Sequence, residues 1–511
     1  MTEVRGAASV GSGLTPAREA RAIRAGERIH VVGVAGAGAS AAALLAHHRG
    51  AVVSGCDPGG PSPYTPPLEA ADIHLEWVHS AAHVTDRPSP ERLAVTKALT
   101  AVDPNNSELA AARASSIPVE PWQQVIADAA AGRSLVGVAG THGKSTTAGW
   151  LVHVLAAAGI DPCAFVGALL PAALTGGLPS TARWGEGMPF VVEADEYAGN
   201  FDPYRPDVAV LTCAEWDHPA VFADRAAVID CFAGWLQRAA QVVARPIVVA
   251  NVGDSGVAEV LGHLRGWRGE VLRTRLAGGP PDGAVGPIAQ LVGTILQADA
   301  TGTTLRLDGP RLAGAPSGRL TTHLKLAGRH NAANALGVAG AALALGVPPD
   351  ALAASLGTFE GVGRRLERKG EGRGVVVYDD YGHHPTAIRE TLSALRQLEP
   401  GRRIWAVYEP LTYHRTAAML AEFAEVLATA DAVAIADIWA SRDPDTTITS
   451  AAALAQATAR RKPGLTAVAP GSVEETAAWL AGEVRRGDAV LVMGGGKSYR
   501  IAELLLEALG R

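Results

Sequence analysis

The sequence predicts an α/β fold with three domains, and three observations lead to this prediction. A strand followed by a glycine-rich turn and a helix occurs near residue 33, and a second such unit occurs near residue 140. After residue 375, apolar strands alternate with helical stretches, which is typical of a parallel doubly wound sheet. A chain of 511 residues also exceeds one hydrophobic core and fits about three domains. We place these domains at residues 27–133, 134–356 and 357–511, after a flexible tail at residues 1–26.

The composition excludes two classes of partner. The net charge of −6, from 45 basic and 51 acidic side chains, provides no broad basic surface for a nucleic acid. The first 26 residues lack the apolar core of a signal peptide, and no apolar run is long enough to span a bilayer. We therefore expect a soluble cytoplasmic protein, monomer or homodimer, with no nucleic-acid partner and no membrane insertion. The four cysteines have no CxxC spacing, so the sequence predicts neither a disulfide framework nor a zinc site.

The central domain begins with a candidate phosphate-binding loop. Residues 134–139 predict a buried strand and Lys144 begins a helix, with a tight glycine-bearing turn between them. The backbone N–H groups of such a turn bind phosphate. The Lys144 ammonium is placed to stabilise the negative charge that develops on a transferred phosphoryl group, and the Ser145 hydroxyl is placed to hold Mg²⁺. Val138 replaces the first glycine of the usual motif, so the loop is a variant, and a simple turn that ends a strand is the alternative. The candidate nucleotide-binding residues are Gly140, Thr141, His142, Gly143, Lys144, Ser145 and Thr146.

Acidic side chains and a histidine follow two further strands of the central domain. One apolar strand ends in Glu193, Asp195 and Glu196, and the strand at 207–212 is followed by His218. Carboxylates at a strand end beside a phosphate loop are suited to bind a metal ion. A neutral histidine can complete a Mg²⁺ shell, although a surface or hydrogen-bonded core histidine explains His218 as well. The predicted metal ligands are Ser145, Glu193 and His218.

The first domain opens with a glycine-rich turn that suits a nucleotide sugar. A strand at 28–33 leads into Gly36 and Gly38, Ser40 lies at the start of the following helix, and the next strand ends at Asp57. Such a turn places a diphosphate or uridine moiety at a helix N-terminus. Close packing of the helix on the strand explains the glycines equally well, and a solvated strand end explains Asp57.

The end of the central domain combines short strands with an asparagine pair. Residues 269–325 contain short Val, Leu and Thr runs broken by Gly and Pro, which predict a small antiparallel sheet packed on the nucleotide domain. The next helix carries Asn331 and Asn334, which lie three residues apart and so share one helical face. Amide side chains can pair with the N6/N7 edge of adenine. Helix capping by Asn331 is the alternative, but it accounts for only one of the two asparagines.

The C-terminal domain gathers polar residues where its first two strands end. The predicted strands are 375–381, 404–408, 432–438, 465–468 and 489–493. The first strand brings Asp380, Tyr381 and His384, and the second is followed by Tyr413 and Arg415. Polar groups at the carboxyl ends of parallel strands are expected to face a ligand. The two histidines of the first segment alternatively cap the helix that follows them.

Seven motifs taken in order resemble the Mur ligases of peptidoglycan synthesis. They are GTHGKST at 140, EADE at 193, a Glu-x-Asp-His step at 215, GRHNxxNA at 328, GVGRR at 361, DDYGHHPT at 379 and TYHRT at 412. The resemblance extends from residue 28 to residue 501. It implies a Rossmann-like N-terminal domain for a UDP-sugar, a central P-loop-type ATPase and a Rossmann-like C-terminal domain for an amino acid.

The resemblance also implies a reaction and a set of residues. ATP would phosphorylate the carboxylate of UDP-N-acetylmuramate, and the amine of L-alanine would attack the acyl phosphate, with Mg²⁺ as the metal. The implied catalytic residues are Lys144, Glu193, His218, Arg365 and Asp380. The residues implied to hold ATP, besides the loop, are Asn331, Asn334, Arg365 and Asp380. The candidate substrate-binding residues are Gly36, Gly38, Ser40, Asp57, Tyr381, His384, Tyr413 and Arg415.

Two other functions stay open on the sequence alone. Residues 193–197 and 215–222 also resemble murein peptide ligases, which attach a recycled tripeptide to the same nucleotide sugar, whereas the TYHRT and DIWASRDPDT segments favour L-alanine. A nucleotide-binding regulator that has lost ligation is the other possibility, and the presence of Lys144 speaks against it. Several positions depart from the family pattern, among them Cys213 in place of an asparagine, Leu411 in place of a histidine and Ala35 in place of a glycine.

Overall fold

The computed structural model describes residues 10–219, 221–278, 289–312, 314, 318–440, 443 and 445–510. The internal contacts divide the chain into two compact units, each described by itself below. The first comprises Met1–Gly293, Leu307–Leu320 and Ala333–Leu356, and the second comprises Thr294–Arg306, Thr321–Ala332 and Gly357–Arg511. The boundaries that we place at residues 26, 133 and 356 stay predictions. Every helix in the described part of the chain is too short or too polar to cross a membrane.

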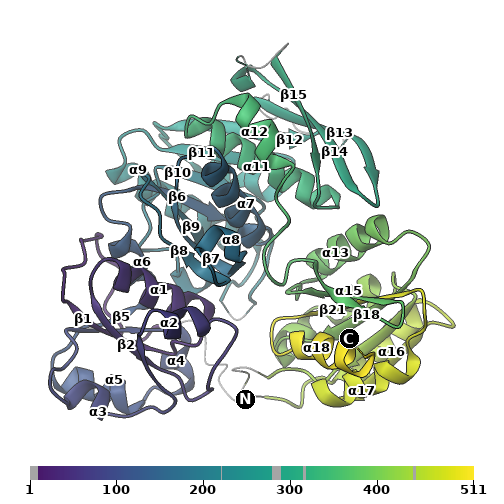
Figure 1. Cartoon of the computed structure of the whole chain (residues 1–511), viewed down its shortest axis with the longest axis horizontal. Helices are drawn as coiled ribbons and strands as arrows, with labels where there is room; N and C mark the ends of the chain where they lie inside the picture. Colours follow the sequence, from purple (N-terminus) through teal and green to yellow (C-terminus); the bar gives the residue numbers. More distant parts are fainter. Residues whose placement is uncertain are drawn as a thin grey trace. The chain divides into compact units, whose positions relative to one another are not determined.

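The N-terminal part of the first unit is a five-stranded parallel sheet with the order β3-β2-β1-β4-β5, as the βαβ pattern predicts. Helices α1 and α6 cover one face of this sheet and helices α3 and α5 cover the other (Figure 1). Its strands are β1 (Arg28–Val32), β2 (Val52–Cys56), β3 (His74–Glu76), β4 (Arg92–Val95) and β5 (Val119–Pro121). Its helices are α1 (Ala37–His48), α2 (Pro66–Ala70), α3 (Ala82–Thr85), α4 (Lys97–Val102), α5 (Ser107–Ala114) and α6 (Trp122–Ala129).

The segment before β1 is attached to this sheet, so the prediction of a flexible tail at 1–26 is wrong for its second half; residues 1–9 lie outside the described residues. Arg18 donates to the carboxylates of Glu120, at 2.8 Å, and Asp128, at 2.7 Å. The side chain of Asp128 is fully buried, and the nearby Ile23 is buried as well. An Ala, Gly and Arg-rich composition resembles a loose tail, but the sequence does not show that the arginines have buried carboxylate partners.

We expect Arg18→Ala to lower the free energy of unfolding by about 1.5–3 kcal/mol, the usual value of hydrogen bonds to charged groups. The loss stays in this range because the buried Arg92 still contacts both carboxylates. Urea titration measures the change, and Arg24→Ala is the control, since the Arg24 side chain is 67% exposed and its ion pairs contribute little. Equal losses in the two variants would contradict the anchoring role of Arg18.

The central sheet has ten strands in the order β15-β14-β13-β12-β11-β10-β6-β9-β7-β8. The strands from β12 to β7 in this order are parallel. The strands are β6 (Ser134–Ala139), β7 (Cys163–Leu170), β8 (Ser180–Arg183), β9 (Pro189–Ala194), β10 (Val208–Leu211), β11 (Ile247–Asn251), β12 (Glu270–Leu276), β13 (Leu291–Asp299), β14 (Gly302–Asp308) and β15 (Arg319–Leu324). The helices are α7 (Lys144–Ala157), α8 (Ala172–Thr175), α9 (Arg225–Val242), α10 (Ser255–His263), α11 (Arg329–Ala344) and α12 (Pro349–Leu356), with a 3-10 turn, η2 (Tyr197–Gly199).

The short strands predicted at 269–325 are present, but they continue the edge of the central sheet. Strand β12 pairs in parallel with both β11 and β13, so the hydrogen-bonded order runs on without a break. The tight connection between β13 and β14, across Thr301, makes those two strands a hairpin. Part of the predicted segment, residues 279–288, lies outside the described residues.

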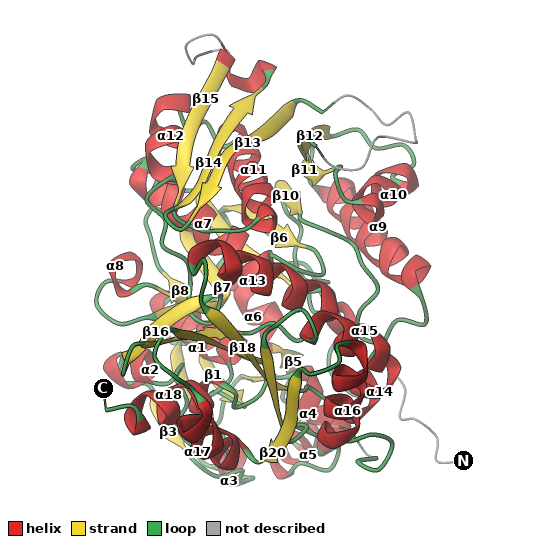
Figure 2. Cartoon of the chain, turned by 90° about the vertical axis from the view of Figure 1, so that its right-hand side faces the viewer, coloured by secondary structure: helices red, strands yellow, loops and turns green. Residues whose placement is uncertain are grey.

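The second unit holds a six-stranded sheet with the order β16-β17-β21-β18-β19-β20, parallel except for β16. Its strands are β16 (Glu367–Gly372), β17 (Val375–Asp380), β18 (Arg403–Glu409), β19 (Ala432–Ala436), β20 (Thr466–Gly471) and β21 (Asp488–Gly494). Its helices are α13 (Pro385–Leu398), α14 (Tyr413–Ala418), α15 (Leu420–Leu427), α16 (Ala451–Arg461), α17 (Val473–Glu483) and α18 (Tyr499–Ala508). Helices α17 and α18 pack on one face, while α15 and α16 lie on the other side of the strands (Figure 2). This arrangement is the doubly wound sheet that the alternating pattern predicts.

Candidate active site

The turn between β6 and α7 has the geometry of a phosphate cradle. Gly140 has φ +139° and Gly143, the N-cap of α7, has φ +81°. A Cβ atom would lie 2.1 Å from Thr212 Oγ1 at Gly140 and 2.7 Å from Asn334 Oδ1 at Gly143. Only glycine fits both positions, and the turn leads directly into the N-terminus of α7. Val138 is a buried residue of β6, so the glycine missing from the motif falls inside the strand rather than in the turn.

The loop after β10 supports this cradle. The Thr141 hydroxyl donates to the carbonyl of Glu215 at 3.0 Å and accepts from its N–H at 2.9 Å. The N–H of His142 donates to Cys213 Sγ at 3.1 Å. Cys213 therefore packs under the cradle and helps to fix its backbone. The side chain of Thr146, in the first turn of α7, is buried.

Lys144 lies beside two carboxylates, and its side chain is only 12% exposed. Its ammonium group donates to the Gly140 carbonyl at 2.7 Å and to Glu196 at 2.8 Å, and it lies 3.5 Å from Asp195. Burial lowers the pKa of Lys144, but Glu196 and Asp195 outweigh this effect, so the pKa lies above its ordinary value. Burial raises the pKa of Glu196 above its ordinary value, although the Lys144 ammonium opposes the rise. Lys144 is therefore positively charged at neutral pH and is held at the mouth of the phosphate cradle.

Ser145 and Glu193 form the oxygen pair that the sequence predicts. The Ser145 hydroxyl donates to Glu193 Oε1 at 3.0 Å, and Glu193 Oε2 accepts from the N–H of Gly167 at 2.6 Å. A Cβ atom at Gly167 would lie 3.0 Å from the carboxylate, so the strand β7 approaches it closely. A hydroxyl and a carboxylate beside a phosphate cradle are hard oxygen donors, the kind that Mg²⁺ prefers. The residues present therefore fit Mg²⁺.

His218 lies in the same unit, next to an aromatic ring. Its backbone has φ +55°, and its imidazole packs edge-on against Tyr197 of η2 with 4.9 Å between ring centroids. The backbone N–H of His218 donates to the Asp217 carboxylate at 2.5 Å. A left-handed backbone at a residue other than glycine is uncommon and costs about 1–3 kcal/mol, so the surrounding structure fixes this turn. The role of His218 as a metal ligand stays a prediction.

Helix α11 begins at Arg329, so Asn331 is not its N-cap. The Asn331 amide donates to the carbonyl of Ala327 at 2.8 Å, and both asparagine side chains are buried. Asn334 reaches the phosphate cradle, where its Oδ1 faces Gly143. The capping alternative is thereby excluded for Asn331, and the adenine contact stays a prediction.

The glycine turn of the N-terminal sheet has structural contacts of its own. Gly38 lies against Trp122 of α6, and a Cβ atom there would be 2.2 Å from the indole ring. The glycine therefore has a packing role, but between two helices rather than between helix and strand. Gly36 is the N-cap of α1, and Ser40 is buried with its hydroxyl 3.2 Å from Thr181 Oγ1. Asp57 accepts from the N–H of Ala35 at 3.2 Å and so braces the turn. Their contact with a nucleotide sugar stays a prediction.

In the second unit, Asp380 at the end of β17 lies next to a loop with two arginines that stack on Tyr381. Asp380 is buried and accepts from the backbone N–H groups of Leu366 and Gly382, each at 2.7 Å. The guanidinium of Arg365 lies 5.2 Å from the ring centroid of Tyr381, and that of Arg364 lies 5.1 Å from it. The carboxylate and the rings thus fix the arginine loop next to the strand end.

His384 and Arg415 lie at the starts of the two helices that follow β17 and β18, His384 as the N-cap of α13 and Arg415 in the first turn of α14. The His384 ring accepts from Thr386 N–H at 3.3 Å and caps α13, as the capping alternative predicts. Arg415 is buried in α14, beside the partly buried Tyr413. Leu411 forms an isolated bridge with Trp439, so it is a backbone contact of the strand end. Substrate contact by these residues stays a prediction.

Comparison with known proteins assigns the family. Three family models match successive parts of the chain: the Mur ligase family catalytic domain at residues 28–134, the Mur ligase middle domain at 138–342 and the Mur ligase glutamate ligase domain at 364–496. The chain is 37% identical to the UDP-N-acetylmuramate--L-alanine ligase of Kineococcus radiotolerans, over 94% of this chain and 96% of the relative. The chain belongs to the Mur ligase family. The ligase of the same name from Roseiflexus sp. is 35% identical over 94% of this chain and 98% of the relative.

Solved structures share the fold of this Mur ligase. The UDP-N-acetylmuramate-alanine ligase from Thermotoga maritima matches with a TM-score of 0.73 and 23% identity, covering 94% of this chain and 98% of that chain. A murein peptide ligase from Psychrobacter arcticus matches with a TM-score of 0.70 and 24% identity, covering 95% and 99%. A MurF ligase from Thermotoga maritima in complex with ADP has a TM-score of 0.56 and 17% identity, covering 83% and 90%. These likenesses confirm the predicted three-domain α/β fold.

One residue of this Mur ligase site received no role in the sequence prediction. Glu196 is 2% exposed and directly contacts the Lys144 ammonium. The sequence shows it only as the last of three acids at a strand end. The sequence does not show that Glu196 is buried. The apolar strand ends two residues before it, so its position in the sequence is that of an exposed loop residue.

A buried carboxylate in the second unit predicts a pH dependence of stability. Burial raises the pKa of Asp379 to about 6, opposed by Arg364 at 3.1 Å. Because the folded state binds this proton more tightly than the unfolded chain, the stabilising contribution is present below about pH 4 and is lost as the pH rises through about 6. The shift corresponds to about 3 kcal/mol.

We expect Asp379→Asn to remove this dependence from the Mur ligase. Between pH 4 and pH 7 the free energy of unfolding of the variant, relative to the wild type, should increase by up to about 3 kcal/mol. Urea unfolding at several pH values measures the difference in free energy of unfolding between variant and wild type. The change of this difference with pH reports the protonation of Asp379, whereas loss of the Arg364 ion pair adds a cost that does not depend on pH. A difference that does not change with pH would contradict the raised pKa.

Proposed function

We propose that this Mur ligase joins L-alanine to UDP-N-acetylmuramate in the cytoplasm, using ATP. The observation that carries the proposal is the position of Lys144 at the mouth of the phosphate cradle, beside the Ser145–Glu193 oxygen pair. This arrangement suits phosphoryl transfer, in which catalysis is mostly positioning and charge neutralisation. The curated relatives that bear the name of an L-alanine ligase along almost their whole length support the choice of substrates.

The residues of the first unit would activate the sugar carboxylate. A carboxylate is a poor electrophile, and phosphorylation to an acyl phosphate supplies the leaving group that an amine can displace. The N–H groups of the cradle would bind the phosphates, and Lys144 would neutralise charge on the transferred group. Ser145 and Glu193 would hold Mg²⁺, which when bound neutralises phosphate charge. Glu196 would keep Lys144 in place between turnovers.

The residues of the second unit would bind the nucleotide and the amino acid. The fixed Asp380 carboxylate and the Arg365 guanidinium, stacked on Tyr381, would contact ATP. The guanidinium of Arg415 has the planar fork that matches a carboxylate with two hydrogen bonds, and it would bind the carboxylate of L-alanine. Its burial supports this role, because a carboxylate ion pair is stronger away from water.

An acceptor screen tests the proposal. The full chain is incubated with ATP, Mg²⁺ and UDP-N-acetylmuramate, and each of L-alanine, glycine, L-serine and L-Ala-γ-D-Glu-meso-diaminopimelate is added separately. Phosphate release and the mass of the product measure ligation. We expect the highest kcat/KM with L-alanine. A higher value with the tripeptide would assign murein peptide ligation instead, and ATP binding without phosphate release for any acceptor would indicate a non-catalytic nucleotide-binding protein.

In the same screen we expect only a limited preference for L-alanine over glycine. The two amino acids differ by one methyl group, and one such group in an apolar pocket contributes about 1–3 kcal/mol, or roughly 10–200-fold in kcat/KM. Competition between the two acceptors in one reaction measures the ratio directly. A ratio near one would show that no pocket surrounds the methyl group.

A further inference from the structure

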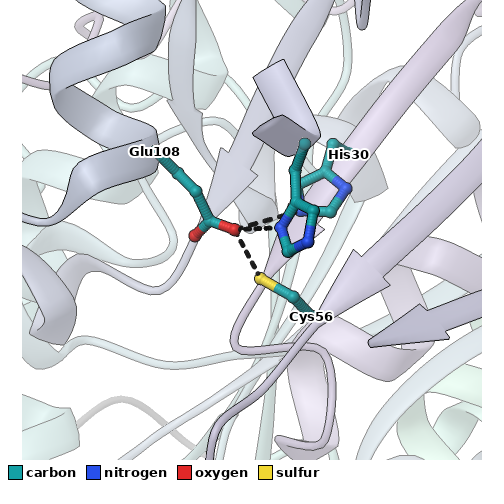
Figure 3. Close-up of side chains that lie close together, drawn as sticks. His30, Cys56 and Glu108 are labelled. Carbon is teal, nitrogen blue, oxygen red and sulfur yellow. Dashed lines mark hydrogen bonds and ion pairs between the residues drawn. The ribbon is translucent and has the colours of Figure 1, made fainter. Parts of the chain in front are cut away.

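A cluster of four metal-ligating side chains lies in the N-terminal sheet, away from the phosphate cradle. His30 is on β1, Cys56 ends β2, His83 is on α3 and Glu108 is in the first turn of α5. Figure 3 shows His30 and Cys56 directed toward the Glu108 carboxylate. The cluster lies on the face covered by α3 and α5, where Cys56 belongs to the apolar core. Its members come from four elements and converge on one point.

The spacing of the four side chains fits one metal ion. One ligand atom from each residue lies within 4.8 Å of all the others. Glu108 Oε1 is 3.0 Å from Cys56 Sγ, 2.5 Å from His83 Nδ1 and 3.6 Å from His30 Nε2. Tetrahedral zinc has ligand distances of about 2.0–2.3 Å, which separate neighbouring ligand atoms by roughly 3.3–3.7 Å. The observed separations therefore need only small side-chain movements to reach zinc geometry.

The imidazole of His30 provides an independent indication of a ligand. His30 is 3% exposed, and its Nε2 makes no hydrogen bond of normal length among the described residues, although it faces Glu108 Oε1 at 3.6 Å. Its other nitrogen, Nδ1, is 2.9 Å from Ser54 Oγ. His83 has the same arrangement, with Nδ1 in the cluster and Nε2 3.1 Å from a carboxylate oxygen of Glu76. In metal sites the second nitrogen of a ligating histidine is usually fixed by an oxygen in this way.

We propose that His30, Cys56, His83 and Glu108 bind one Zn²⁺ ion that ties α3 and α5 to the sheet. A thiolate and two imidazoles select zinc over Mg²⁺ or Ca²⁺, which take oxygen ligands. Binding replaces two hydrogen bonds to Glu108, from the Cys56 thiol and from His83 Nδ1, with bonds to the metal ion. The thiol proton and the proton of His83 Nδ1 are both released to solvent. His79 lies 2.9 Å from the other carboxylate oxygen of Glu108. Its side chain is 19% exposed, so this side of the cluster is not sealed from solvent.

The spacing of the cysteines could not predict this site. The sequence rule for zinc looks for cysteines and histidines in close pairs, whereas these ligands are spread from residue 30 to residue 108. Only the parallel pairing of β1 and β2, with His30 opposite Ser54, brings His30 and Cys56 together. No zinc site is expected from the sequence when only the spacing of cysteines along the chain is considered.

Metal titration of the full chain tests the proposal. The protein is treated with a chelator, and Co²⁺ is added as a spectroscopic substitute for Zn²⁺, with Mg²⁺ present to occupy oxygen sites. We expect one equivalent of Co²⁺, the intense d–d bands of a tetrahedral ion and a thiolate-to-cobalt charge-transfer band, all displaced by one equivalent of Zn²⁺. Absence of uptake, or an octahedral spectrum without the thiolate band, would overturn the proposal.

Two variants locate the ion. Cys56→Ser should abolish the charge-transfer band, and His83→Gln should weaken Zn²⁺ binding by at least about 100-fold, since even outer-shell changes cost 10–100-fold. The matched controls are Cys231→Ser and His263→Gln, which change a cysteine of α9 and an exposed histidine of α10 outside the cluster. Circular dichroism verifies that each variant folds. Unchanged cobalt spectra in both cluster variants, or equal losses in the controls, would place the ion elsewhere and refute the assignment.

Discussion

Replacement of Lys144 by alanine is expected to lower phosphate release that depends on L-alanine and UDP-N-acetylmuramate by about 10³-fold. Loss of a single preorganised donor from a transition-state site typically costs 10²–10³-fold in kcat, and this donor carries a full charge. The effect should appear in kcat rather than in KM for L-alanine, because the lysine contacts the phosphate cradle. Steady-state kinetics with each substrate varied in turn measures how much of the loss is in kcat and how much is in each KM.

The variant should still fold, for a reason that the structure gives. Removal of the ammonium leaves Glu196 buried, but burial already raises the pKa of this carboxyl group, and loss of the opposing Lys144 charge raises it further, so the group can take up a proton. The loss of stability in Lys144→Met, which keeps the side-chain volume, should accordingly be smaller at pH 6 than at pH 8. Lys97→Ala is the control, since this half-buried lysine donates to the carbonyls of Ala198 and Gly199. Ligation that persists in Lys144→Met would show that the cradle does not hold the transferred phosphate.

The parts of this Mur ligase that the sequence predicts well are those specified by local pattern. The glycines of the cradle require a positive φ, and a Lys-Ser pair must follow at the start of a helix, so residues 140–146 identify the loop without an alignment. Parallel strands that are buried on both faces are continuous apolar runs, which is why β6, β9 and β10 are found correctly.

The parts that the sequence does not predict depend on partners distant along the chain. Arg18 looks like a tail residue because Glu120 and Asp128 lie more than a hundred residues away. The strands after β12 look like a separate sheet, since nothing local shows that β12 pairs with β11. The ligand cluster around Glu108 is missed for the same reason. Long-range pairing and burial, rather than composition, decide each of these cases.

Glu193→Gln is expected to lower kcat/KM for ligation at least about 100-fold and to raise the Mg²⁺ concentration needed for half-maximal activity. Even outer-shell partners of metal sites contribute 10–100-fold, and a direct ligand should contribute no less. The amide keeps the shape of the side chain, and its oxygen can still accept from Gly167 N–H, so the strand contact persists. What the variant loses is the negative charge beside the Ser145 hydroxyl.

The Mg²⁺ titration separates this role from a structural one. A variant that only disturbed the packing of β9 would lose activity at every Mg²⁺ concentration, whereas loss of a metal ligand should be partly recovered at high Mg²⁺. Glu259→Gln is the control, because that carboxylate is 50% exposed and pairs with Arg225 on the surface. Wild-type Mg²⁺ dependence in Glu193→Gln would assign metal binding to the neighbouring carboxylates instead. Lys144 would then share its two carboxylates with the ion, and the charge balance proposed for the cradle would be wrong.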